Sequence, residues 1–225
     1  MNLQSSPKIV MVLHRVPYNS TFLLQKFEVL SEHMNLWLLA WDRKRNLTRL
    51  PDTGRAIRNR VVLGPASVSV PEIARGIVIA LGRFFCTPIR TVRFYNFLLK
   101  RHGLAKGSLR FLKYVSFLRL NPDLVHFEFG TIAREMIELK AFFGFKVIAS
   151  FRGYDLNFVG LEYPDYYKSV WRDVDGLHFL GRDLRTRAGK RGYDGDKLEV
   201  LISPAIDLEF FKRTTHFPKI GRAHV

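Results

Sequence analysis

Two segments of the chain begin as apolar strands and end in polar and glycine residues. They are PDLVHFEFG at 122–130 and SFRGYDL at 150–156. Side chains alternate along a strand, so His126 and Glu128 share one face, and neighbouring parallel strands would bring Glu128 and Arg152 to one rim of the sheet. The arginine could clamp a phosphate or pyrophosphate, and the glutamate could act as a base or bind sugar hydroxyls. Alternatively, Glu128 and Arg152 form a structural ion pair, and His126 is a hydrogen-bonded histidine of the rim.

Two further residues of the second segment fit the same rim. Gly153 suits a tight turn at which the backbone approaches a ligand. Asp155 suits either a cap for the next helix, which is the commoner role, or a bond to a hydroxyl group. A third segment, LISPAIDLEFF at 201–211, is a strand that runs into a proline and an aromatic pair, and its large apolar side chains are expected to pack in a short turn against the domain.

The elements that must position these residues are strands that alternate with helices. Apolar faces and breaker residues predict helices after Ser20, from Gly130 to Gly144, at 163–174 and at 182–191, and basic helices at 73–122 that break near Pro88 and Gly103–Gly107. The sequence therefore predicts an α/β fold of three layers with a mostly parallel sheet of about seven strands. Its ligand crevice would lie outside the carboxyl ends of the strands. Near-continuous apolar runs place these strands at 8–14, 35–41, 60–63, 124–129, 146–151, 176–180 and 198–202.

Several functional classes lack their sequence signals. The loop after the first strand, His14–Pro17, has no glycine, and neither the dinucleotide fingerprint nor the P-loop is present, which argues against a dehydrogenase or an NTPase. Cys86 is the single cysteine, so an internal disulfide is excluded, and no Cys/His cluster has zinc-ligand spacing. We expect neither a signal peptide nor a transmembrane helix.

The charge of the chain is concentrated in one region. The formal net charge is +16, and the stretch between Ile73 and Pro122 holds ten Lys and Arg residues with no Asp or Glu. Aromatic residues interleave with these cations, which is typical of basic amphipathic helices that lie on anionic lipid. An ordinary solvated face and a nucleic-acid surface are the two alternatives.

Together, the three segments resemble the N-terminal half of retaining GT-B glycosyltransferases, and most closely family 4, which acts on bacterial lipopolysaccharide, exopolysaccharide and glycolipids. The resemblance extends over residues 8–213 and includes the segment from Pro17 to Phe22. Two residues depart from the family, because Glu128 and Arg152 both stand where histidine is usual. The two changes suggest one compensated exchange, a Glu128–Arg152 ion pair, and a histidine-based catalytic role is not carried over.

The resemblance implies a Rossmann-like acceptor-side domain at 1–213, followed at 214–225 by a truncated linker with an artefactual tail. It also implies that a second domain would hold the nucleotide-sugar donor, so that this chain would be inactive alone. Neither a metal nor a tightly bound cofactor is expected. Within that framework we predict catalytic roles for Glu128 and Arg152, and acceptor binding by His126, Gly130, Gly153, Asp155 and Arg15.

The implied partners are a nucleotide sugar, a glycan or lipid-linked acceptor, and an anionic membrane surface bound through residues 73–122. The implied location is cytoplasmic and peripheral, at the inner face of the cytoplasmic membrane, and nucleic acid is not expected. Two other functions stay open. The chain could be a basic module that binds lipid or nucleic acid, or a fragment of a sugar-nucleotide epimerase.

Overall fold

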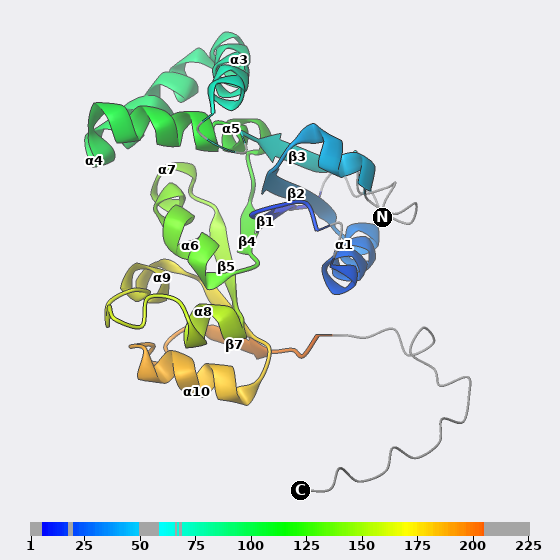
Figure 1. The fold of residues 1–225 in the computed structure, drawn as a ribbon, viewed down its shortest axis with the longest axis vertical. Helices are drawn as coiled ribbons and strands as arrows, with labels where there is room; N and C mark the ends of the chain where they lie inside the picture. The colour runs from blue at the N-terminus through cyan, green and yellow to red at the C-terminus, as the bar shows by residue number, and fades with distance from the viewer. Residues whose placement is uncertain (1–5, 18–19, 50–58, 66, 68, 205–225) are drawn as a thin grey trace, which may run out of the picture.

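The computed structural model describes residues 6–17, 20–49, 59–65, 67 and 69–204, which form an α/β fold around one parallel sheet (Figure 1). The strand order is β3-β2-β1-β4-β5-β6-β7, and every neighbouring pair is parallel, as predicted. The order reverses between β1 and β4. The strands are β1 Lys8–Leu13, β2 Asn35–Trp41, β3 Val61–Gly64, β4 Leu124–Phe127, β5 Lys146–Phe151, β6 Gly176–Phe179 and β7 Leu198–Leu201.

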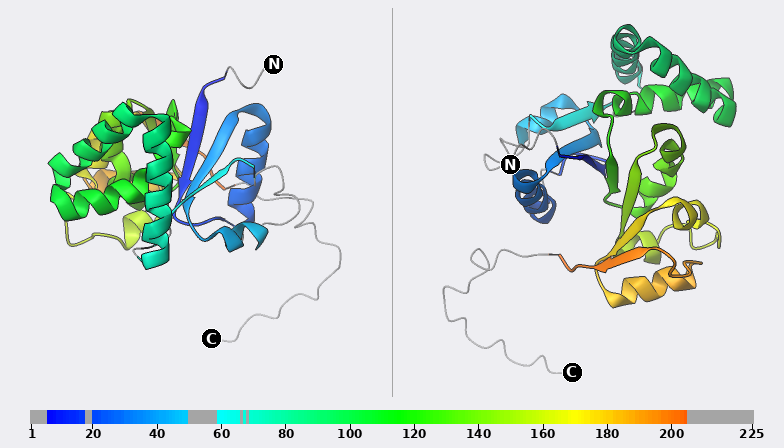
Figure 2. Two further views of the ribbon diagram at one scale, coloured as in Figure 1. Left: turned by 90° about the horizontal axis from the view of Figure 1, so that it is seen from above. Right: turned by 180° about the vertical axis from the view of Figure 1, so that it is seen from behind.

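Helices cover both faces of the sheet, and the left view of Figure 2 shows α1 and α4 on opposite sides of the first strands. Because side chains alternate along β1, Met11 and Leu13 pack with α1, whereas Val10 and Val12 join the larger core under the other helices. The helices are α1 Thr21–His33, η2 Lys44–Arg49, α3 Val70–Cys86, α4 Pro88–Tyr114, α5 Ser116–Leu120, α6 Gly130–Met136, η4 Ile137–Leu139, α7 Lys140–Phe143, α8 Gly153–Asn157, α9 Lys168–Asp173 and α10 Arg182–Lys190.

The basic region forms the helices α3, α4 and α5, as predicted. The first break falls at Thr87, and the second falls at Gly103, whose φ of 74° interrupts α4. Proline starts a helix readily but cannot continue one, and glycine tolerates a left-handed φ, so both breaks follow from local chemistry. In Figure 1 the pair α3 and α4 lies at one end of the molecule, opposite the end that holds β7 and α10. No helix in the described ranges is long and apolar enough to cross a bilayer.

Two predicted elements differ from the structure, and the short helix η2 was not predicted. The helix expected from Gly130 to Gly144 is divided into α6, η4 and α7. The helix expected at 163–174 begins only at Lys168, although an apolar face of this segment is buried, at Tyr167, Val170, Trp171 and Val174. The turn expected at 207–211 and the tail at 214–225 lie outside the described residues.

Candidate functional site

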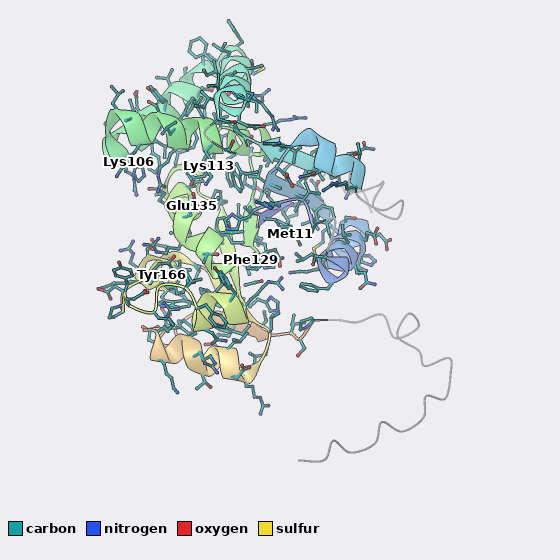
Figure 3. All side chains as sticks on the ribbon, in the orientation of Figure 1. Met11, Lys106, Lys113, Phe129, Glu135 and Tyr166 are labelled. Carbon is teal, nitrogen blue, oxygen red and sulfur yellow. The ribbon has the colours of Figure 1, made fainter. Side chains whose placement is uncertain are left out.

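The candidate site lies at the carboxyl edge of the sheet, where the strand order reverses. In an open parallel sheet, the loops after the two strands at such a reversal diverge and leave a crevice. Here these are the loop after β1, which contains His14 and Arg15, and the segment after β4, which contains Glu128 and Phe129. Phe129 packs against both hydrophobic cores and is labelled in Figure 3. The topology therefore predicts a ligand crevice at this edge of the sheet, where the predicted residues lie.

Glu128 forms the predicted ion pair with Arg152. Arg152 Nη2 lies 2.9 Å from Glu128 Oε2, and Arg152 Nε donates to the Glu128 carbonyl oxygen at 3.1 Å. A second cation also binds this carboxylate, because Lys26 Nζ of α1 donates to Glu128 Oε1 at 2.6 Å. Glu128 is fully buried, whereas the side chains of Arg152 and Lys26 keep 14% and 21% of their surface exposed. Two cations that reach the surface therefore share one buried carboxylate.

Aromatic rings fix the guanidinium of Arg152. Its Cζ lies 4.7 Å from the ring centroid of Phe22 in α1 and 4.8 Å from that of Phe129. Stacking of this kind adds cation–π attraction to the charged hydrogen bonds. Described residues use two of the five N–H donors of Arg152. The remaining donors and the partial exposure leave room for an anionic ligand oxygen.

Glu128 stays ionised in this environment. Burial alone would raise the pKa of its carboxyl group, but Lys26 and Arg152, which are charged and hydrogen-bonded to it, outweigh that effect and hold the pKa below its ordinary value. Both carboxylate oxygens already accept hydrogen bonds from cations. Glu128 is thus better suited to holding Lys26 and Arg152 than to accepting a proton from a substrate, and its predicted catalytic role stays a prediction.

His126 begins a row of polar side chains that crosses three strands. His126 Nε2 lies 2.8 Å from Ser150 Oγ, and Ser150 Oγ lies 2.8 Å from His178 Nδ1. The row ends where His178 Nε2 donates to the Ile202 carbonyl oxygen at 3.0 Å. Burial lowers the pKa of His126 to about 4. The alternative of a hydrogen-bonded rim histidine is thereby confirmed for its contacts, while its role toward an acceptor stays a prediction.

Asp155 joins two helix ends at the crevice. Its Oδ2 accepts the backbone N–H of Arg152 at 3.0 Å and its Oδ1 accepts that of Thr131 at 3.0 Å, so one carboxylate caps both α8 and α6. The capping role is confirmed. Burial raises the pKa of Asp155, although the two backbone N–H groups oppose the shift. Acceptor binding by Asp155 stays a prediction.

The two predicted glycines differ in why the fold needs them. A Cβ atom on Gly130 would lie 2.3 Å from the ring of Phe151, so Gly130 is required by the packing of α6 on β5. A Cβ atom on Gly153 would meet only Asn157 Nδ2, at 3.6 Å, and the φ of Gly153 is not positive. Packing against Phe151 therefore requires glycine at position 130, whereas no packing contact requires glycine at position 153.

Arg15 is exposed on the loop after β1, and it makes no hydrogen bond or ion pair with any other described residue. Asp42 at the end of β2 anchors this loop, because its Oδ2 accepts the Val16 N–H at 3.0 Å. The structure does not bring Arg15 into the Glu128 cluster.

A second charged group on the crevice was not predicted. Lys113 of α4 donates to the carboxylate of Glu135 in α6, and the two lie together in Figure 3. Tyr114 Oη donates to the same carboxylate at 3.0 Å. The exposed His14, at the end of β1, lies close enough for the charges of Lys113 and Glu135 to affect its pKa. Within the described ranges, no group of three or more His, Cys, Asp or Glu residues could hold a metal ion.

Comparisons with known proteins do not assign this chain to a family. No protein-family model matches this chain, and no curated protein is similar to it in sequence. The likeness to GT-B glycosyltransferases therefore depends on the three sequence segments, and the function has to be argued from the site.

Proposed function

We propose that this chain is the acceptor-binding, N-terminal half of a retaining glycosyltransferase that moves a sugar from a nucleotide sugar to a lipid-linked or polysaccharide acceptor. The observation that carries the proposal is the cluster of Lys26, Glu128 and Arg152 beside the strand reversal. Two cations and one carboxylate leave one surplus positive charge. Such a cluster suits a phosphate group, either on a glycolipid acceptor or on the leaving diphosphate.

The cluster would act by position and charge rather than by proton transfer. Glu128 would hold Lys26 and Arg152 in fixed places, and the cations would stabilise negative charge that develops on a phosphate oxygen. The donor site would lie in a second domain, so we expect residues 1–225 to transfer no sugar alone. Sequence of the gene beyond residue 213 would separate a glycosyltransferase from an epimerase, because their second domains differ.

A binding experiment tests the phosphate assignment. The probe is farnesyl phosphate, a short soluble lipid phosphate, titrated calorimetrically into the chain. Replacement of Lys26 by methionine removes one cation of the cluster and should weaken binding about tenfold or more, since a hydrogen bond to a charged group contributes about 1.5–3 kcal/mol. The matched control is Lys168→Met, whose lysine is exposed and pairs with Asp165 rather than with Glu128. Equal binding by the two variants, or sugar turnover by residues 1–225 alone, would contradict the proposal.

We also propose that the turn between α3 and α4 enters an anionic bilayer from the cytoplasmic side. Phe85 and Ile89 are 80% and 75% exposed on either side of this turn, and Leu81 and Phe84 beside them are also exposed. Exposed cations such as Arg93 lie on the following helix. Apolar tips with a basic surround bind lipid headgroups and the acyl boundary together. Nucleic acid would not need the exposed aliphatic residues, so the surface favours lipid.

Vesicle co-sedimentation tests this surface. Wild type should pellet with vesicles that contain phosphatidylglycerol and far less with pure phosphatidylcholine. The double variant Phe85→Ser/Ile89→Ser should lose most of this binding, whereas the control Tyr163→Ser, which changes an aromatic side chain that is 66% exposed elsewhere, should keep it. Salt-sensitive binding of duplex DNA without binding of vesicles would instead support the nucleic-acid alternative.

A further inference from the structure

The polar row of His126, Ser150 and His178, named the histidine row here, has a fixed direction of hydrogen bonds. The row ends on the Ile202 carbonyl oxygen, which can only accept, so His178 Nε2 carries a hydrogen. In a neutral imidazole the other nitrogen is then an acceptor, so Ser150 donates its hydroxyl hydrogen to His178 Nδ1. The Ser150 oxygen is left to accept from His126 Nε2. The row therefore places the hydrogen of His126 on Nε2 and leaves Nδ1 as a bare acceptor.

His126 Nδ1 faces another acceptor across a short gap. Glu128 Oε1 lies 3.6 Å from it, and no hydrogen of the neutral ring lies between them. Protonation of His126 would place a hydrogen on Nδ1, between the two acceptors. The surroundings of the ring disfavour its positive charge. Burial of the ring is the largest of these effects. Lys26 from α1, Arg152 after β5 and His178 from β6 add to it, whereas Glu128 favours a charge there.

Lys26 supplies a donor beside this acceptor. Its ammonium group donates one hydrogen to Glu128 Oε1, the same oxygen that faces His126, and described residues use none of its other two hydrogens. The side chains of His126 and Lys26 are 15% and 21% exposed, so part of each is accessible to solvent. An acceptor and a donor side by side are complementary to a hydroxyl group, which donates one hydrogen and accepts another.

We propose that His126 Nδ1 and Lys26 Nζ bind a hydroxyl group of a sugar or polyol ligand, and that Ser150 and His178 are positioning residues that hold His126 in the required tautomer. The ligand hydroxyl donates to His126 Nδ1 and accepts from Lys26 Nζ. A fully ionised phosphate oxygen has no hydrogen for Nδ1, so this position selects a hydroxyl beside the phosphate-binding arginine. Identification of the ligand as a glycan acceptor rests on the proposed function, but the hydroxyl position does not.

Nitrogen-15 NMR of histidine-labelled protein tests the tautomer directly. At neutral pH, His126 should carry its hydrogen on Nε2 and show an unprotonated Nδ1. Ser150→Ala should abolish the dominance of this tautomer, because Nδ1–H can then turn toward Glu128. Ser150→Thr, which keeps the hydroxyl, should retain it, and Ser116→Ala, which changes a buried serine elsewhere, should not affect it. A hydrogen on Nδ1 in wild type, or an unchanged tautomer in Ser150→Ala, would overturn the proposal. If Ser150→Ala does not fold, the wild-type spectrum alone still tests which nitrogen of His126 carries the hydrogen.

The hydroxyl contact is tested with glycerol, D-glucose and D-mannose as probes. At least one of them should shift the Nδ1 resonance of His126 in wild type, and the shift should be lost in Lys26→Met. Absence of a shift with all three would overturn the hydroxyl site. Neither measurement requires sugar transfer or phosphate binding, so failure here can be told apart from failure of the proposed function.

Discussion

Replacement of Glu128 by glutamine removes the charge that Lys26 and Arg152 share and keeps the side-chain volume. Loss of one partner from a buried ion pair costs about 3–5 kcal/mol, because a charge is left without compensation. Glu128 is fully buried, but Lys26 and Arg152 stay 21% and 14% exposed, so water can relieve part of this cost. We therefore expect the free energy of unfolding to fall by about 3 kcal/mol, the lower end of that range. For a domain of this size the corresponding fall in Tm is about 6–12 °C.

Urea denaturation at several pH values measures the effect. The pKa of Glu128 lies below its ordinary value of 4.5 in the folded protein, so its stabilising contribution is complete above pH 4.5 and is lost as the pH falls through the folded value. The difference between wild type and Glu128→Gln should thus be largest near neutral pH and shrink in acid. The control is Glu162→Gln, an exposed glutamate whose loss should change stability by less than about 0.5 kcal/mol.

Two results would refute this reasoning. The first is a loss of less than about 1 kcal/mol at neutral pH, which would mean that the buried pair does not stabilise the fold. The second is a difference that stays constant as the pH falls below 4.5, which would mean that the ionised form of Glu128 is not responsible.

Three further substitutions separate packing, ligand access and protonation. Gly130→Ala should lower stability by about 1–3 kcal/mol in urea denaturation, because its Cβ would lie 2.3 Å from the Phe151 ring, and unchanged stability would contradict this packing. Gly153→Ala has open space beyond Asn157 and should not lower stability, so weaker binding of farnesyl phosphate by this variant would indicate that a ligand approaches the backbone there. His126 should contribute a loss of about 3 kcal/mol to wild type between pH 6.5 and about 4, since its unfolded imidazole takes up a proton that the folded one does not. His126→Gln should flatten this slope, and parallel curves for the two proteins would contradict it.

The sheet could be predicted because its signals are local. The near-continuous apolar run of β2 is typical of a strand buried on both faces, and the breaks at Pro88 and Gly103 follow from single residues. The Glu128–Arg152 ion pair could be predicted from the sequence for a related reason. Both residues follow strands, and parallel neighbours bring their carboxyl ends together.

The rest of the site depends on packing between distant elements. Lys26 precedes Glu128 by 102 residues, and only the docking of α1 on the sheet brings them together. One signal could have found it, because Lys26 is four residues after Phe22 and four before Leu30, a cation on an otherwise apolar helix face. The contact of Ser150 with His178 requires the register between β5 and β6, which no local pattern fixes. The tie from Asp155 to α6 likewise needs two separate helices in place.

The Ile202 carbonyl oxygen is linked to His126 through the hydrogen bonds of Ser150 and His178. It is the last acceptor of the histidine row, and it lies just after β7, two residues before the described segment ends. If the chain left the sheet at a different angle, His178 would lose this acceptor and could exchange its tautomer, which would reverse the Ser150 hydroxyl and move the hydrogen of His126 to Nδ1. A turn of one peptide group would then be transmitted across three strands as a change in hydrogen position, without any movement of the strands themselves. The tautomer of His126, and with it the acceptor offered to a hydroxyl, would then depend on the orientation of the Ile202 peptide group.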